Sequence, residues 1–396
     1  MDLTLDAATA LPRDGTSGTL LGRAWVPEQD GPSVVLVRAD GVWDISAAAP
    51  TMAGLLNAPD PLAIVRGAAR AIRLGGVAEL LANTPAGLRD RRRPWLLAPI
   101  DLQAIKAAGV TFAQSLLERV VEEQSRGEPG RADAMRAGLV VEIGTDLAQV
   151  VPGSPEAERL KVVLQKQGMW SQYLEVGIGP DAEIFTKSQP MSAVGTGAAI
   201  GLHPKSVWNN PEPEIVLAVG ADGVIRGAAL GNDVNLRDFE GRSALLLGKA
   251  KDNTGSCAVG PFLRLFDETF GLDDVRRADI GLTVAGDDGF VLEGASSMRM
   301  ISRDPADLVA QAIGPQNQYP DGFVLFLGTM FAPTKDRGVA GSGFTHKLGD
   351  IVTIQTPALG ALVNRVQTCD TLPPWTFGTL ALMRNLARRG LLSGRG

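Results

Sequence analysis

The sequence predicts a β-rich protein of the mixed α+β class, with a small N-terminal domain and a larger C-terminal domain. Beyond Glu183 the chain consists of short apolar runs separated by glycine and proline, a pattern typical of strands. The helices that periodicity predicts all precede this stretch. The length of 396 residues exceeds the roughly 150 residues of a typical domain, so we expect two domains.

The N-terminal segment predicts a hairpin followed by a helix. An apolar run at 33–38 precedes Asp40-Gly41, a favoured two-residue turn, and a second apolar run follows at 42–45. The Ala- and Leu-rich stretch 61–74 then predicts a helix. These elements indicate a compact unit that is rich in strands.

The segment 89–94 is the best candidate for a domain boundary. It combines four arginines with a proline, a composition typical of a solvated linker. We therefore predict a small β-rich domain over 1–93 and a larger domain over 94–396.

Two amphipathic stretches predict helices in the larger domain. Over 112–123, apolar residues spaced three and four apart form one stripe, and polar residues that include Glu118 occupy the opposite side. A second helix is expected over 154–168, because Ser154 suits the N-cap and proline suits the first helical position. Strands are expected within 215–232, 322–328 and 351–366.

Composition and charge exclude several classes of function. The chain has 44 acidic and 38 basic residues, so no basic stripe is expected for nucleic acid. Cys257 and Cys369 are too few for a disulfide framework or a thiolate zinc site. The acidic start does not resemble a signal peptide, and no apolar run is long enough to span a membrane. We expect a cytoplasmic protein with no membrane partner.

Carboxylates cluster between Asn209 and Arg242. Glu212 and Glu214 are two residues apart, so they share one face of an extended segment. If the hairpin turns at Asp222-Gly223, Glu212 faces Asp233 across the pair of strands. Three converging acids repel one another unless a cation lies among them, and oxygen ligands suit Mg²⁺ or Mn²⁺. The alternative is that these acids decorate a solvated strand.

At this point the sequence resembles the fumarylacetoacetate hydrolase family. The principal matches are a Glu-x-Glu motif within 210–214 and an Asn-Asp-x-x-x-Arg-Asp motif within 232–238. Further matches occur in family order over about three quarters of the chain. They include 185–187, Lys251 ahead of Gly260-Pro261, 327–329, 348–350 and 360–366. The sequence around these motifs is most similar to a subgroup of the family that dehydrates 2-keto-3-deoxy-pentonates such as the D-xylonate derivative.

The resemblance implies a fold and a ligand set. The expected fold is a family-type C-terminal β-roll beside the smaller N-terminal domain, usually in a homodimer. The resemblance implies that Mg²⁺, or Mn²⁺, is held at three positions and chelates the 2-oxo acid substrate. Those positions are Glu212, Glu214 and Asp233. It also implies that Lys251 supports a developing enolate and that Thr329 binds the substrate carboxylate.

The sequence departs from the family pattern at two places. Family hydrolases carry a His-x-x-Glu pair that activates water, whereas here Ser115 stands at the histidine position and Glu118 is retained. An insertion around 125–180 separates Glu118 from the next motif. Without the resemblance, Ser115 and Glu118 would be assigned to the solvated face of an amphipathic helix.

These features predict a hydro-lyase that converts a 2-keto-3-deoxy-pentonate to α-ketoglutarate semialdehyde in oxidative pentose catabolism. Glu118 is expected to move protons, and Ser115 to position water or the leaving hydroxyl. Lys251 and Arg237 offer positive charge near the enolate or carboxylate, and Lys187 does the same or braces the site. Two alternatives remain: a C–C hydrolase of a 2,4-diketo acid, and a catalytically silent relative that binds sugar acids.

Overall fold

A computed structural model describes residues 3–392 apart from 127, 129–149, 167, 169, 332, 334 and 339–342. The strands within this part of the chain are β1 (Leu20–Val26), β2 (Gly31–Arg38), β3 (Gly41–Asp44), β4 (Ile72–Gly75), β5 (Trp95–Leu97), β6 (Ala104–Gly109), β7 (Glu183–Ser188), β8 (Ala199–Leu202), β9 (Asn209–Asn210), β10 (Pro213–Val219), β11 (Ile225–Asp233), β12 (Asn235–Leu236), β13 (Cys257–Leu265), β14 (Asp279–Ala285), β15 (Val291–Ser297), β16 (Phe323–Phe326), β17 (Ile351–Thr356) and β18 (Gly360–Thr368). The α-helices are α1 (Ala7–Ala10), α2 (Met52–Leu56), α3 (Pro61–Arg66), α4 (Val77–Asn83), α5 (Ala113–Ser125), α7 (Pro155–Lys166), α8 (Gln172–Ile178), α9 (Arg237–Glu240), α10 (Leu247–Lys251), α11 (Leu272–Arg276), α12 (Pro305–Ala312) and α13 (Thr379–Arg388).

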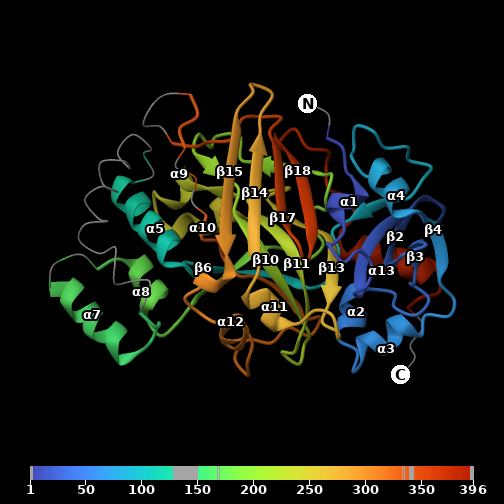
Figure 1. The fold of residues 1–396 in the computed structure, drawn as a ribbon, viewed down its shortest axis with the longest axis horizontal. Coiled ribbons are helices and arrows are strands. Elements are labelled where there is room, and N and C mark those ends of the chain that lie inside the picture. The colour runs from blue at the N-terminus through green and yellow to red at the C-terminus, as the bar shows by residue number, and fades with distance from the viewer. Residues whose placement is uncertain are drawn as a thin grey trace.

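One large sheet runs through most of the molecule. Its strand order is β4-β3-β2-β1-β13-β11-β10-β16-β6-β7, and β5 pairs with β1 beside this path. The N-terminal strands therefore continue the sheet of the C-terminal part through the pairing of β1 with β13 (Figure 1). The division at residues 93 and 94 stays a prediction.

A second sheet packs against the first, and the main core lies between them. Its order is β15-β14-β17-β18-β8. Because strand side chains alternate, Ile215, Leu217 and Val219 of β10 join this core together with Ile280 and Leu282 of β14. The β-rich mixed architecture that the sequence predicts is confirmed.

The hairpin of β10 and β11 has the expected pairing but a different turn. Gly220 N donates to Val224 O at 3.0 Å, so the loop holds the three residues 221–223 rather than two. A bulge follows, because Ala218 pairs with Gly227 whereas Val219 pairs with Ile225. The extra residue in the bulge offsets the extra residue in the loop. The register beyond the bulge is therefore the predicted one.

The predicted hairpin at 33–45 is confirmed, but its turn lies at Ala39-Asp40 rather than at Asp40-Gly41, because Gly41 already pairs with Arg38. Two of the predicted helices are confirmed, and the predicted helix over 61–74 is too long. β2 pairs with β3, α5 covers Ala113–Ser125, and α7 begins after Ser154, whose Oγ accepts from Ala157 N at 3.1 Å. The helix α3 ends at Arg66. Residues 72–75 form β4 instead, because their backbone pairs with β3, and β4 becomes the edge strand of the sheet.

Helices cover both ends of the sheets. α5, α7 and α8 share an apolar cluster with Val110 and Trp208 at one end, and α13 lies beside the N-terminal strands at the other (Figure 1). Part of the predicted insertion, at 127, 129–149, 167 and 169, falls outside the described residues. Among the residues that are described, no helix has the length and apolar character needed to span a membrane.

Candidate active site

The hairpin of β10 and β11 brings three carboxylates together. Glu212 immediately precedes β10, Glu214 lies within it, and Asp233 ends β11. Asp233 N donates to Glu212 O at 3.1 Å, which confirms the predicted pairing. One oxygen from each of the three side chains lies within 4.8 Å of the others, and all three residues are buried. We call these residues the carboxylate triad.

The chemistry of the carboxylate triad fits a divalent cation. Burial raises the pKa of Glu214 well above its ordinary range, and the negative charges of Asp233 and Glu212 raise it further. Gly328 N donates to Glu214 Oε2 at 2.7 Å, which opposes the shift in part. A hard cation at this point would relieve the repulsion, and carboxylate oxygens are the ligands that Mg²⁺ prefers.

Two lysines neutralise part of the carboxylate triad. Lys251 Nζ donates to Glu212 Oε2 at 2.6 Å and to Asp233 Oδ2 at 3.0 Å. Lys187 Nζ lies 2.9 Å from Asp233 Oδ1 and is fully buried. Burial raises the pKa of Asp233, but the two lysines outweigh this effect and hold it below its usual value. Lys187 thus lies beneath the pocket surface and stabilises Asp233, whereas Lys251 lines the pocket itself.

The helix α5 presents its polar side to the same pocket. Arg119 Nη2 donates to Glu212 Oε1 at 2.6 Å, and its Nη1 lies 2.7 Å from Glu122 Oε2 and 2.9 Å from Glu240 Oε2. Burial raises the pKa of Glu240 to about 7, although Arg119 and Lys251 oppose the shift. The guanidinium of Arg119 therefore joins the hairpin that carries the carboxylate triad to the helix α5.

Arg237 holds the proposed base, Glu118, in the network. Its Nη2 donates to Glu118 Oε2 at 3.2 Å, and its Nε donates to Glu122 Oε1 at 2.6 Å. The guanidinium also stacks over Trp208, with its carbon 4.3 Å from the ring centroid. A continuous chain of ion pairs thus runs from Glu118 through Arg237, Glu122 and Arg119 to the carboxylate triad.

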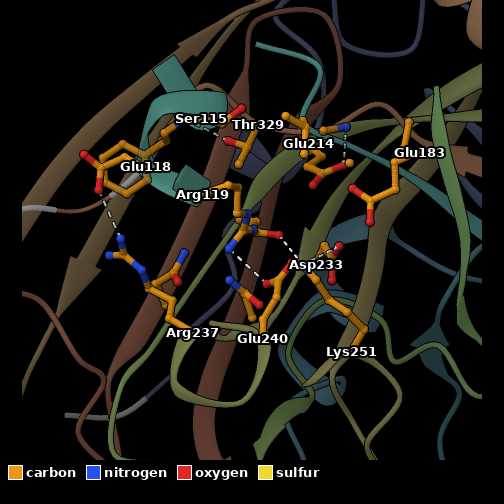
Figure 2. A pocket seen from close by; sticks show the side chains of 18 of the residues that line it. Ser115, Glu118, Arg119, Glu183, Glu214, Asp233, Arg237, Glu240, Lys251 and Thr329 are labelled. Carbon is orange, nitrogen blue, oxygen red and sulfur yellow. Dashed lines mark hydrogen bonds and ion pairs between the residues drawn. The ribbon is translucent and has the colours of Figure 1, made fainter. Parts of the chain in front are cut away.

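Ser115 and Thr329 complete the predicted set. Ser115 Oγ donates to Phe112 O at 2.9 Å in the first turn of α5, and Thr329 Oγ1 accepts from Phe331 N at 3.1 Å. Both side chains reach the pocket wall (Figure 2). The structure therefore gathers the predicted site residues around one pocket, with Lys187 lying just beneath its surface.

The pocket has a large excess of acidic groups. Its carboxyl groups belong to Glu118, Glu122, Glu183, Glu212, Glu214, Asp233 and Glu240. Its cationic groups belong to Arg119, Arg237 and Lys251. Such an imbalance in a buried space favours the binding of a cation. No histidine is found among the described residues that line this pocket.

Sequence reasoning missed Arg119, Glu122 and Glu183. The first two share the polar side of α5 with Glu118, and that side was open to interpretation as a solvated face. Glu183 lies two residues before Phe185, the first residue of the matched motif 185–187. In a strand, residues two apart share a face, and this was the available signal that Glu183 faces the site. A paired partner from a distant segment, such as Glu212 for Arg119, is not visible in the sequence.

Comparison with known proteins identifies the class of the main domain. Residues 175–367 match the family model described as the C-terminal domain of fumarylacetoacetate (FAA) hydrolase. The matched stretch covers just under half of the chain and includes the carboxylate triad, Lys251 and Thr329. The family resemblance that the motifs predict is confirmed.

Two relatives of known name are similar in sequence. The chain is 32% identical over 185 residues to 2-dehydro-3-deoxy-D-arabinonate dehydratase of Saccharolobus solfataricus, which is 47% of this chain and 58% of that protein. It is 28% identical over 204 residues to a probable 2-keto-3-deoxyxylonate dehydratase of Haloferax volcanii, which is 52% of this chain and 66% of that protein. Each match spans less than two thirds of the relative's length.

Solved structures share the fold over a longer stretch. A crystal form of 2-keto-3-deoxyarabinonate dehydratase superposes with a TM-score of 0.59 at 21% identity, covering 88% of this chain and 99% of that chain. A structure of 2-keto-3-deoxy-D-arabinonate dehydratase complexed with magnesium and 2,5-dioxopentanoate gives 0.58 at the same identity and coverage. These likenesses confirm the predicted fold.

Proposed function

We propose that this protein is a magnesium-dependent hydro-lyase. It removes water from a 2-keto-3-deoxy-pentonate, of the kind derived from D-xylonate, and yields 2,5-dioxopentanoate, which is α-ketoglutarate semialdehyde. The observation that carries this proposal is the buried carboxylate triad in one pocket with Glu118. The dehydratase names of both sequence relatives support the same reaction. The reaction belongs to the oxidative catabolism of pentoses.

The reaction requires a group that reaches both C3 and the C4 hydroxyl. We assign this role to Glu118, because its carboxyl group lines the pocket and Arg237 fixes its orientation. Glu118 removes a proton from C3 and returns a proton to the hydroxyl that leaves C4. General acid–base help of this kind is worth roughly 10²–10⁴-fold in rate.

Positive charge supports the enolate that forms when C3 loses its proton. A divalent cation bound to the carboxylate triad would act as a Lewis acid toward the 2-oxo acid. Lys251 adds a fixed ammonium group at the same place, because Asp233 and Glu212 hold it there. Burial lowers the pKa of Lys251, but these two carboxylates outweigh burial and keep the pKa above its ordinary value. We assign the hydroxyl of Thr329 to the substrate carboxylate and that of Ser115 to the leaving group.

The absence of a histidine from the described wall of the pocket favours dehydration over C–C hydrolysis. Hydrolysis of a 2,4-diketo acid needs an activated water, which an imidazole can deprotonate near neutral pH. The hydroxyl of Ser115 cannot accept and hold that proton, and it already donates to the Phe112 carbonyl. Dehydration needs no such base at this position.

The direct test is to identify the product. Purified protein with Mg²⁺ is incubated with 2-keto-3-deoxy-D-xylonate, which is the same compound as 2-keto-3-deoxy-D-arabinonate, and separately with its L enantiomer and with a 2,4-diketo acid, and products are followed by NMR. We expect 2,5-dioxopentanoate from a pentonate, with no pyruvate released. Chelation should abolish turnover, and added Mg²⁺ should restore it. Faster cleavage of the diketo acid than dehydration of either pentonate would overturn the proposal.

The role of Glu118 has its own test. Glu118→Gln should lower the rate at least about a hundredfold, because an amide cannot exchange protons with C3. Magnesium affinity, measured by calorimetry, should stay unchanged. The matched control is Glu123→Gln on the same helix, whose carboxylate contacts Gln172 rather than the pocket. Near wild-type turnover in Glu118→Gln would assign the base elsewhere.

A further inference from the structure

Glu183 is distinct among the carboxyl groups of the pocket. Each of the other six accepts a hydrogen bond or forms an ion pair, whether from an arginine, a lysine or the backbone of Gly328. Within the described part of the chain, no hydrogen bond or ion pair holds the carboxyl group of Glu183. Glu183 is half-buried, and it lacks the stabilising partner that each of the other six carboxyl groups has, so its position calls for a functional reason.

The strand β7 aims Glu183 at the reaction site. Because strand side chains alternate, Glu183 and Phe185 share one face of β7, in the part of the strand that precedes the bulge at Lys187. Both side chains line the pocket, so this face is the one turned to the carboxylate triad. Figure 2 shows the Glu183 side chain pointing into the pocket near Glu214 and Asp233, far from Glu118.

The neighbouring strand leaves room for this carboxyl group. Gly109 of β6 pairs directly with Glu183, and a Cβ atom at Gly109 would lie only 1.9 Å from Glu183 Oε2. Any larger residue would push the carboxyl group away. The bare backbone at Gly109 therefore allows Glu183 to lie over β6 against the pocket.

The proposed reaction needs a second site of proton transfer. Loss of water from C3 and C4 gives 5-hydroxy-2-oxopent-3-enoate, which is an isomer of the product. A proton must then leave C5, and its electron pair shifts through C4 and C3 to the C2 oxygen. A proton returns to C3, and the remaining C4–C5 enol takes a proton at C4 and loses its hydroxyl proton. During the dehydration, Glu118 transfers protons at C3 and at the C4 hydroxyl. The removal of the C5 proton therefore still needs a base.

We propose that Glu183 is a second catalytic base, which removes the C5 proton and converts the enone to 2,5-dioxopentanoate. This inference rests on the proposed function and assigns its second half to a separate residue. Burial raises the pKa of Glu183, and although Arg119 and Lys251 oppose the shift, the negative charges of Glu212 and Asp233 add to it. A raised pKa makes a carboxyl group a stronger base.

The test separates the two halves of the reaction. In D₂O, Glu183→Gln should still exchange the C3 protons of the pentonate and still release water, whereas Glu118→Gln should lose the exchange. Glu183→Gln should accumulate the enone, which is seen by its conjugated absorbance and vinyl protons. When the enone is supplied as the substrate, this variant should convert it at least about a hundredfold more slowly than wild type.

Controls keep the result interpretable. Gln is isosteric with Glu, and burial favours the neutral form, so Glu183→Gln should fold and bind Mg²⁺ as the wild type does. Glu183→Asp retracts the carboxyl group by one methylene and should accumulate less enone. Glu293→Gln, on the exposed side of β15, is the matched control and should form none.

Three outcomes overturn the inference. One is that Glu183→Gln converts the enone at the wild-type rate. Another is that this variant loses both the exchange of the C3 protons and turnover. The third is a wild-type protein that converts neither pentonate, which overturns the proposed function as well. An active wild type with an unaffected Glu183→Gln variant leaves the proposed function in place and removes only the second base.

Discussion

At the scale of single residues, the pocket is organised by shared cations. Arg119 contacts Glu122, Glu212 and Glu240 at once, so the position of one member of the carboxylate triad depends on two carboxylates outside the triad. Burial raises the pKa of Glu122, but Arg119 and Arg237 outweigh it and hold the pKa below its usual value. The same environment raises the pKa of Glu240, because Arg119 offsets only part of its desolvation.

This difference predicts how stability depends on pH. The folded protein binds a proton at Glu240 up to about pH 7, whereas the unfolded chain releases it near the ordinary value of about 4.5. The contribution of Glu240 to the free energy of unfolding therefore falls as pH rises from about 4.5 to about 7. The variant Glu240→Gln cannot titrate at this position, so it lacks this pH-dependent contribution to the free energy of unfolding. Melting temperatures of both proteins are measured without metal between pH 5 and 8, and the melting temperature of the variant should rise relative to that of the wild type as pH rises. Parallel curves of melting temperature against pH would contradict the raised pKa of Glu240.

Single residues also show what the sequence could and could not predict. Glu212, Glu214 and Asp233 were predictable because strand alternation and a hairpin turn are local rules. Glu118 required a family resemblance, because its helix has a polar side that solvent would equally satisfy. The role of Arg119 was not predictable, since two of its three partners come from segments about 90 and 120 residues further along the chain.

At the scale of elements, the hairpin of β10 and β11 supports the site through close packing. Gly231 lies opposite Glu214, two residues before Asp233. A Cβ atom at Gly231 would lie 2.4 Å from Phe326 Cε1 and 2.5 Å from Val216 Cγ2, both of which are buried. No larger side chain fits unless the buried side chains of both Phe326 and Val216 move.

Gly231→Ala should therefore destabilise the fold and weaken metal binding together. Overpacking of a buried site costs about 1–3 kcal/mol, and any shift of the hairpin moves Glu214 and Asp233 apart. Denaturant unfolding and calorimetric titration with Mg²⁺ measure the two effects. Gly87→Ala, where a Cβ atom meets nothing within 4 Å, is the control. An alanine at 231 that leaves both quantities unchanged would show that the hairpin tolerates the added methyl group.

At the scale of the whole molecule, the two ends of the chain are tied together. The C-terminal helix α13 lies beside the N-terminal strands (Figure 1), and buried Asn385 donates through Nδ2 to the carbonyls of Gln29 and Asp30 at 2.9 Å each. The large sheet then connects these strands to the pocket through β1 and β13. The homodimer and the cytoplasmic location stay predictions.

The contact of α13 should support the fold without touching the chemistry. Asn385→Ala leaves two carbonyl groups without their donor, and a loss of about 1–3 kcal/mol in the free energy of unfolding is expected. Magnesium affinity should not change, because none of the pocket residues contacts α13. Asn317→Ala, at an exposed turn, is the control. A variant with normal stability but weakened metal binding would contradict this division.

The bulge after the turn of β10 and β11 has a consequence for how this protein can vary. Because one surplus residue in the loop is cancelled by one surplus residue at Arg226, the spacing of the metal ligands is set several residues away from the loop itself. The loop can gain or lose a residue, with a matching change at the bulge, while the ligands keep their places. Because Ala221 N donates to Asn57 Oδ1 and Arg226 Nε donates to Leu56 O, such a change in length must also preserve or replace these contacts with the end of α2.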